Sequence, residues 1–220
     1  MTRATIPPQA INFFSGLEEN NNRDWFLANK KTYEDAVKTP FVSLIEEISR
    51  LWAAQDIPLR GGANTIFRIN RDVRFSKDKS PYKTHISGLL TASGSKNPVE
   101  PLVYLHMDAQ GGFLAAGLWQ PDTESLRHFR TKIVDEEEAF TELVSALEAE
   151  GLSLDRTSAA KMMPRGFADY ADHPHSDCIK LKNLIVRREL SARDWSSDFL
   201  VNSILSFMNG SLPLLRFVSR

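Results

Sequence analysis

The chain has 220 residues, of which 42% are hydrophobic and 25% are charged, as in an ordinary globular protein. Its 27 lysines and arginines nearly balance its 28 aspartates and glutamates, which argues against a nucleic-acid binder that relies on overall charge. The single cysteine, Cys178, excludes a disulfide framework within the chain and suits the reducing cytoplasm. The N-terminus lacks the apolar stretch of a secretory signal, and no apolar run is long enough for a membrane span. We therefore expect a cytoplasmic protein with no membrane partner.

Three helices are predicted before the Gly61-Gly62 break. The first follows Pro7-Pro8 and ends at the Asn20–Asn22 run, since apolar residues recur between them at helical spacing. Asn22 is expected to cap the second helix. Thr39-Pro40 is expected to start the third, with a cap followed by proline at the first helical position. That third helix is expected to run to about Trp52.

Strands are predicted in the middle of the chain, over residues 86–92, 102–108 and 112–118. The last two are separated by Ala109-Gln110-Gly111, a short turn that suits an antiparallel hairpin.

Helices return in the second half. Asp122 is expected to cap one helix, and Asp135 to start another that ends at Gly151. A short strand is predicted over residues 184–190, followed by a last helix capped by Ser196 or Ser197. This order predicts an α+β fold formed by one compact domain over residues 1–220, with N-terminal helices, a central antiparallel sheet and a C-terminal helix.

One segment, residues 68–85, concentrates positive charge in a nearly neutral protein. Its sequence is RINRDVRFSKDKSPYKTH, and only Asp72 and Asp78 oppose its basic residues, which are Arg68, Arg71, Arg74, Lys77, Lys79 and Lys83. In a strand or in a helix, several of these side chains share one side. Four apolar residues are interleaved with them, and we expect these to be partly buried against the N-terminal helices and the sheet: Phe67, Ile69, Val73 and Phe75.

Two interpretations of this charge stay open. Guanidinium and ammonium groups match the oxygens of phosphate or carboxylate, so the segment can form an anion site, and backbone amides of Ser76–Pro81 can contribute to it. Alternatively, the arginines form a structural network of ion pairs that joins the helices to the sheet. Its partners would come from Asp24, Glu34, Asp72, Asp78 and Asp122.

At these residues the sequence resembles a mainly bacterial family of conserved hypothetical proteins, domain of unknown function twenty-four sixty-one. The matching positions are Arg68, Arg71, Asp72, Arg74, Phe75, Asp78, Lys79 and Tyr82. Further similar blocks are NNNRDWFLANKKTYEDAVKTPF, GLWQPD and PRGFADYADHP, so the resemblance extends over almost the whole chain. It implies a single domain of about this length and supplies no catalytic residues.

From the residues themselves, we expect a pocket that binds a small anionic ligand. The candidate ligand-binding residues are Arg68, Arg71, Asp72, Arg74, Lys77, Asp78, Lys79, Tyr82, Lys83, His85 and Trp119. If a reaction occurs, Asp72 or His85 would be the general base. The alternative is a module that binds an acidic protein or, less favoured, a nucleic-acid backbone.

No metal or organic cofactor is expected. Two histidines and three carboxylates gather in DYADHPHSD, residues 169–177, but His173 and His175 flank Pro174 and would point apart in an extended segment. Cys178 lies beside apolar residues and is expected to be buried and unreactive.

Overall fold

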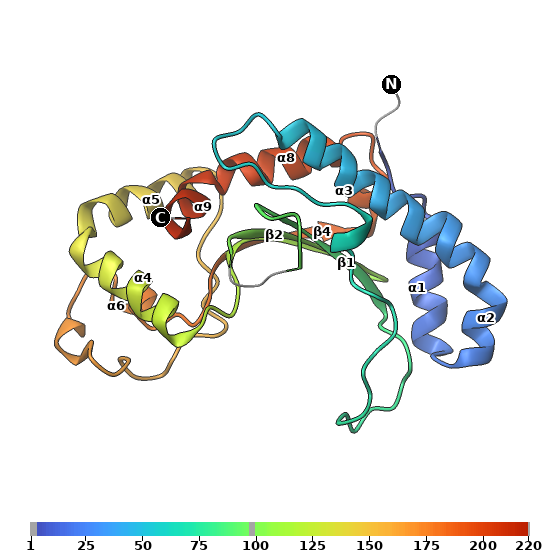
Figure 1. Cartoon of the computed structure of the whole chain (residues 1–220), viewed down its shortest axis with the longest axis horizontal. Helices are drawn as coiled ribbons and strands as arrows, with labels where there is room; N and C mark the ends of the chain where they lie inside the picture. Colours follow the sequence, from blue (N-terminus) through green and yellow to red (C-terminus); the bar gives the residue numbers. More distant parts are fainter. Residues whose placement is uncertain (1–3, 97–99, 220) are drawn as a thin grey trace. The chain divides into compact units, whose positions relative to one another are not determined.

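The computed structural model describes residues 4–96 and 100–219 (Figure 1). These residues divide into two compact units. Unit 1 comprises residues 4–96, 104–114 and 189–206, and unit 2 comprises residues 100–103, 115–188 and 207–219. The described residues form one antiparallel sheet, with its strands in the order β1-β2-β3-β4. The strands are β1 (His85–Thr91), β2 (Leu102–Asp108), β3 (Gly111–Leu118) and β4 (Leu184–Ser191).

Unit 1 begins with α1 (Gln9–Glu19), α2 (Arg23–Thr32) and α3 (Thr39–Trp52). Asn22 caps α2 as predicted, because its side chain accepts a hydrogen bond from the backbone N–H of Trp25 at 3.0 Å. The predicted cap at Thr39-Pro40 is wrong: a π-helical turn, Tyr33–Lys38, joins α2 directly to α3. Pro40 lacks the N–H of a regular helical bond, and the wider turn carries the helix past it.

Helix α3 covers one face of the sheet in unit 1. A Cβ added to Gly88 of β1 would lie 2.4 Å from Ile45 and 3.4 Å from Phe41, both on α3. Any larger residue at this position would force the Ile45 side chain to move, so Gly88 favours the close approach of helix and strand. Side chains alternate along a strand, so His85 and Ser87 lie on the face of β1 opposite α3.

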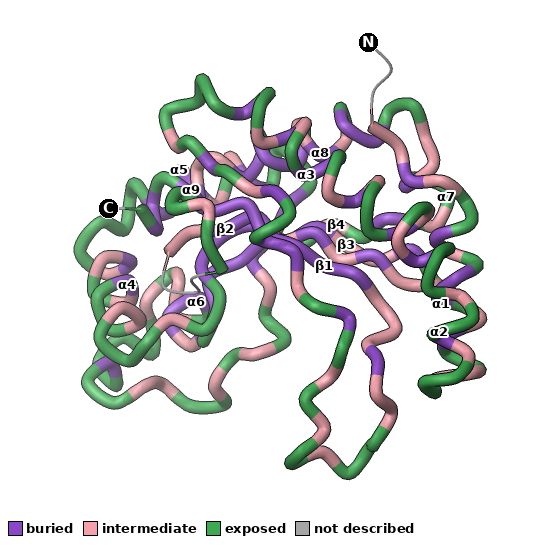
Figure 2. The backbone as a smooth tube through the Cα atoms, turned by 45° about the vertical axis from the view of Figure 1, so that its right-hand side comes forward, coloured by how far each residue is buried: buried purple, intermediate pink, exposed green. Residues whose placement is uncertain are grey.

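The segment before β1 returns along the edge of that strand. Antiparallel bridges pair Arg60 with Thr91, Ile66 with Gly88 and Asn70 with Tyr82. We call residues 66–84 the arm and residues 72–80 its tip. Figures 1 and 2 show the two limbs of the arm projecting from the sheet on the side opposite α3, with exposed residues concentrated at the tip.

Unit 2 contains α4 (Thr123–Asp135), α5 (Glu137–Ala149), α6 (Ser176–Ile179) and α9 (Leu212–Val218). Asp122 caps α4 as predicted, accepting from the Ser125 N–H at 2.7 Å. The predicted start of α5 at Asp135 is wrong, because Asp135 ends α4 and the chain turns at Glu136.

Residues 192–210 contain α7 (Ala192–Trp195) and α8 (Leu200–Gly210). Ser196 and Ser197, the predicted cap positions, lie between α7 and α8, and the Ser197 hydroxyl accepts from the Phe199 N–H at 3.1 Å just before α8 begins. Gly210 ends α8, and Pro213 lies in the first turn of α9.

The predicted α+β class is confirmed. The expected strands lie within one or two residues of β1 to β4, and residues 109–110 join β2 to β3 as the expected hairpin. Within residues 4–96 and 100–219, no helix has the length and hydropathy required to span a membrane.

Candidate functional site

The base of the arm docks on the N-terminal helices through Tyr82. This side chain is buried, and its ring stacks on that of Phe26 with 4.1 Å between ring centroids and 20° between planes. Asn21 donates to the Tyr82 carbonyl at 3.0 Å and accepts from the Tyr82 N–H at 3.1 Å. Tyr82 therefore holds the arm in place.

Ion pairs inside the arm neutralise two of its arginines. Arg71 donates to Asp78, and Arg74 forms a forked pair with Asp72, with Nε–Oδ1 and Nη2–Oδ2 distances of 3.0 and 2.7 Å. Ser80 and Arg71 together lower the pKa of the Asp78 carboxyl through hydrogen bonds. These two arginines therefore form ion pairs within the arm and not the predicted network that joins the helices to the sheet.

The tip of the arm is exposed. The Lys79 ammonium donates to the Val73 carbonyl at 3.0 Å, which helps to close the loop. Ile69 is buried and Val73 is half-buried, as expected, but Phe75 is 95% exposed. The expectation that Phe75 is partly buried is wrong, because the tip extends beyond both the helices and the sheet.

A second group of cations surrounds Phe67, at the base of the arm. The ammonium groups of Lys83 and Lys96 lie 5.4 and 5.7 Å from the centroid of its ring, within the range of a cation–π contact. Arg68 is close enough for its charge to lower the pKa of Lys83. Among the described residues, no carboxylate lies within 4.0 Å of these three cations. We call Arg68, Lys83 and Lys96 the cation cluster.

Aromatic side chains continue from Phe67 across the face of the sheet opposite α3. The Phe67 ring meets that of Tyr104 at 6.4 Å, edge to face. The rings of His85, His106 and Phe113 form a stack across β1, β2 and β3, with centroid distances of 4.2 and 4.7 Å. Each of these side chains is half-buried, so the face is partly open to solvent.

Three polar side chains of β2 lie in a row on this face. Tyr104, His106 and Asp108 alternate along the strand and so point to the same side. The Tyr104 hydroxyl lies 3.2 Å from Nδ1 of His106, and Nε2 of His106 lies 3.3 Å from Oδ2 of Asp108. A phenol, an imidazole and a carboxylate are thereby linked in sequence.

Burial changes the protonation of the groups around this row. Burial, with His106 and Lys83 beside it, lowers the pKa of His85 to about 4, so His85 is neutral at pH 7. Burial also raises the pKa of the Tyr104 phenol. Burial, followed by the charges of Arg68 and Lys96, lowers the pKa of the Lys83 ammonium. The face therefore holds a partly desolvated cation, Lys83, and the neutral rings of His85 and Tyr104.

The predicted site residues are divided among several places. Lys83, Arg68 and His85 lie at the base of the arm, where the sheet face begins, while Arg71, Asp72, Arg74, Lys77, Asp78 and Lys79 belong to the outer arm. The sequence analysis did not identify the cation–π contacts of Phe67 or the contribution of Lys96. It also missed the row of Tyr104, His106 and Asp108. The alternation YLHMD in a predicted strand was the available signal for that row.

Trp119 belongs to unit 2, where it is 43% exposed after the end of β3. The following residue, Gln120, has a positive φ of 48°, and its N–H donates to Oδ1 of Asn183 at 2.8 Å. Asn183 donates in turn to Ser158 at 2.9 Å. These contacts explain the turn around Trp119 by local structure alone.

The histidines of residues 169–177 contact α5 in unit 2. His173 accepts at Nδ1 from the His175 N–H at 3.0 Å, and its Nε2 lies 3.1 Å from Glu137. His175 Nε2 lies 2.7 Å from the Thr141 hydroxyl. Within the described part of the chain, no group of three or more His, Cys, Asp or Glu side chains is arranged to hold a metal ion. Cys178 is buried, which raises the pKa of its thiol.

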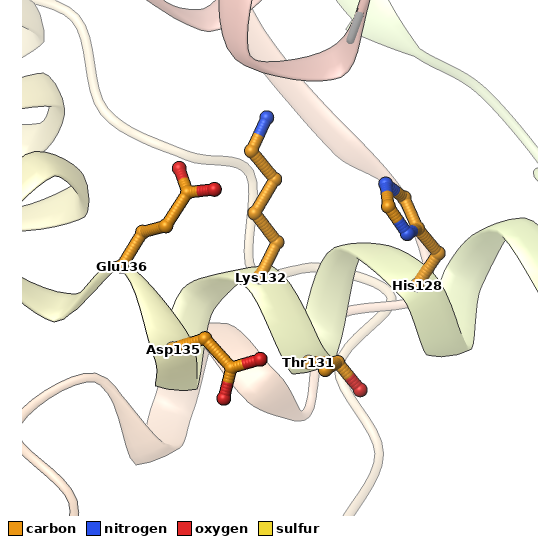
Figure 3. Close-up of a pocket in the computed structure, with 5 residues that line it drawn as sticks. All are labelled: His128, Thr131, Lys132, Asp135 and Glu136. Atoms are coloured by element: carbon orange, nitrogen blue, oxygen red, sulfur yellow. The ribbon is translucent and has the colours of Figure 1, made fainter.

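A hollow of about 370 Å³ lies beside α4 in unit 2 and is lined by His128, Thr131, Lys132, Asp135 and Glu136. Figure 3 shows His128 and Lys132 projecting from one side of α4 and Thr131 and Asp135 from the other. The Lys132 ammonium donates to the Phe217 carbonyl at 2.9 Å and lies 4.3 Å from the Phe217 ring centroid. The cation of this hollow thus ties α4 to α9, and the hollow contains none of the predicted site residues.

These observations define an α+β protein with a basic arm and a polar aromatic sheet face. The chain belongs to the conserved hypothetical protein family DUF2461, whose family model matches residues 9–217. The resemblance in the sequence is thereby confirmed. No curated protein matches the chain significantly.

Proposed function

We propose that the protein binds a small anionic ligand, bearing a phosphate or carboxylate group, at the cation cluster. One observation supports this most strongly: Lys83 and Lys96 both lie over the Phe67 ring, with Arg68 near Lys83 and no carboxylate within 4.0 Å of the three cations among the described residues. Like charges held this close raise the free energy of the unliganded protein. An anion relieves that repulsion, so the arrangement favours its binding.

The partial burial of Lys83 strengthens the argument. An ammonium group that has lost part of its hydration interacts more strongly with an anion, because the local dielectric constant is lower than in water. Phe67 offers a flat apolar surface beside the charges, on which the carbon skeleton of a ligand can rest. We therefore expect affinity to depend on both the anionic group and Phe67.

Calorimetric titration with pyrophosphate, inorganic phosphate and citrate tests the proposal. We expect Lys83→Ala to weaken binding by about tenfold, the loss of one charge-assisted interaction. Lys77→Ala is the matched control, since it removes the same charge from an exposed position at the tip. Equal affinity in the parent and Lys83→Ala, or no heat with any of the three anions, would exclude the cation cluster as the site.

The alternative ligand is a nucleic-acid backbone. Phe75 and Lys77 are exposed at the tip, where an aromatic ring and a cation could contact such a ligand. Single strands bind to aromatic faces that are free for stacking. Here both faces of His106 are covered, by His85 and by Phe113, so the sheet offers a poor platform for bases. Anisotropy with a labelled single-stranded oligonucleotide separates the two: a steep salt dependence of binding, with a slope that Lys77→Ala reduces by about one, would favour the nucleic acid over the small anion.

A further inference from the structure

The tautomer of a neutral His106 follows from the two groups beside its ring nitrogens, the Tyr104 hydroxyl at 3.2 Å and the Asp108 carboxylate at 3.3 Å. An ionised carboxylate only accepts, so Nε2 of His106 carries the proton that faces Asp108. Nδ1 of the neutral imidazole is then an acceptor, and the Tyr104 hydroxyl donates to it. Asp108 thus holds His106 in the one tautomer that can receive the proton of Tyr104.

We propose that Tyr104, His106 and Asp108 form a catalytic row for phosphoryl transfer, in which His106 activates the Tyr104 phenol toward a small phosphate ester held by the cation cluster. The substrate class rests on the proposed function, whereas the reactivity of Tyr104 can be tested without it. Tyr104 and His106 would be catalytic residues. Asp108 would be a positioning residue that acts through His106.

The first step transfers the phosphoryl group to the protein. Oη of Tyr104 forms a bond to phosphorus as its proton moves to Nδ1 of His106, and the bond from phosphorus to the leaving oxygen breaks. The leaving alkoxide takes that proton from His106 and departs as an alcohol. In the second step, water gives its proton to His106 and attacks phosphorus, and the phenolate released from phosphorus recovers that proton from His106. The products are an alcohol and phosphate, and the protein is regenerated.

The surroundings of the row suit this chemistry. A neutral His85 stacks on His106, so no neighbouring imidazolium opposes the charge that His106 gains. The Asp108 carboxylate stabilises that same charge. The Phe67 ring contacts the Tyr104 ring and also the ammonium groups of Lys83 and Lys96, so the phenol shares an aromatic neighbour with cations that would stabilise developing negative charge on a phosphoryl group.

Labelling with diisopropyl fluorophosphate tests the reactivity directly. In this reaction the phenol oxygen bonds to phosphorus, fluoride leaves and the proton passes to His106. The reagent carries no charge, so it does not need the cation cluster. Tyr170 is an internal reference, because it is 37% exposed and belongs to the other unit. Mass spectrometry of digested protein should show Tyr104 labelled at least about 100-fold faster than Tyr170, the advantage of a positioned general base.

Three variants distinguish activation of the Tyr104 phenol from a purely structural role of the row. Tyr104→Phe removes only the hydroxyl and should abolish both the label at this position and the hydrolysis of p-nitrophenyl phosphate. His106→Gln should reduce labelling to the rate of Tyr170. In Asp108→Asn, the amide can donate to Nε2 and leave the proton on Nδ1, so labelling should fall by about 100-fold or more. The nitrogen chemical shifts of His106 should report this change of tautomer, which a merely structural role of Asp108 would not produce.

The two proposals fail in different ways. Labelling of Tyr104 no faster than that of Tyr170 would overturn the catalytic row even if pyrophosphate binds. Fast labelling together with no hydrolysis of p-nitrophenyl phosphate would overturn the phosphoryl-transfer reaction. Fast labelling and hydrolysis that both persist in Lys83→Ala would support the row and overturn the cation cluster as its substrate site.

Discussion

The imidazole of His85 lies against that of His106, with 4.2 Å between ring centroids and 29° between ring planes. The rings come from adjacent strands, β1 and β2, on the face of the sheet that α3 leaves open. Burial lowers the pKa of His85 to about 4, and the neighbouring His106 and Lys83 act in the same direction. The stack therefore depends on His85 remaining neutral.

This stack should make the stability of the protein depend on pH in a definite direction. The unfolded chain protonates His85 near its ordinary pKa of about 6.5, whereas the folded protein does so only near the lowered value, about 4. Between these values the unfolded state binds more protons, so the free energy of unfolding falls as pH decreases. After allowance for the partial exposure of His85, the loss is about 1–2 kcal/mol.

Urea unfolding of the parent and of His85→Phe, at about pH 7 and about pH 4.5, measures this effect. Phenylalanine keeps a ring in the stack but cannot titrate. The parent should lose more stability than the variant on acidification, since all other groups are common to both. The same loss in both proteins would show that folding does not lower the pKa of His85.

Tyr82 should act through its ring and not through its hydroxyl. The ring is 6% exposed and stacks on Phe26, while the hydroxyl forms no hydrogen bond within the described residues. Tyr82→Ala should therefore cost about 3 kcal/mol of stability, as for other large buried aromatic side chains. Tyr82→Phe should cost less than about 0.5 kcal/mol. A large loss in Tyr82→Phe would instead restore the polar role expected from the sequence.

Gly112 fixes the backbone beneath the catalytic row. Its φ is +121°, and an added Cβ would lie 2.0 Å from the His106 carbonyl oxygen on the paired strand. Gly112→Ala combines a strained φ with a backbone clash, so we expect a loss of about 3 kcal/mol or more. Gly94→Ala is the matched control, with φ of +67° but its nearest atom 3.6 Å away, and should cost about 1 kcal/mol. Equal losses in denaturant titration would mean that the clash is relieved by movement of the strands.

The sequence predicted the helices and strands better than it predicted which side chains contact one another. Alternation and capping residues located the strands and the starts of α2 and α4, because these signals act over a few residues. The π-helical turn before Pro40 was missed, since proline is as compatible with a helix start as with a widened turn.

The candidate site was predicted in part for a similar reason. Charge density identified the arm, but whether Arg71 meets Asp78 or a ligand depends on how the loop closes. Lys96 reaches Phe67 from a distant part of the chain, which no local pattern shows. Tyr104, His106 and Asp108 share a strand face by simple alternation, yet their significance depends on His85 and Phe67 packing beside them.

The arginines of the arm should contribute unequally to anion binding. Arg74 is exposed and forms its forked pair with Asp72, so its charge is already met within the tip. Arg74→Ala should therefore leave both the unfolding midpoint and the affinity for pyrophosphate unchanged within error. Arg68 has no carboxylate within 4.0 Å among the described residues and acts on Lys83, so Arg68→Ala should weaken pyrophosphate binding.

Calorimetric titration of both variants, and of the double variant Asp72→Ala/Arg74→Ala, measures this difference. The double variant keeps the net charge of the arm and should bind like the parent. Asp72→Ala alone leaves Arg74 without its partner and serves to detect a site at the tip. If pyrophosphate binds more tightly to Asp72→Ala and is lost in Arg74→Ala, the anion site lies at the tip, and the charge at the base of the arm needs another explanation.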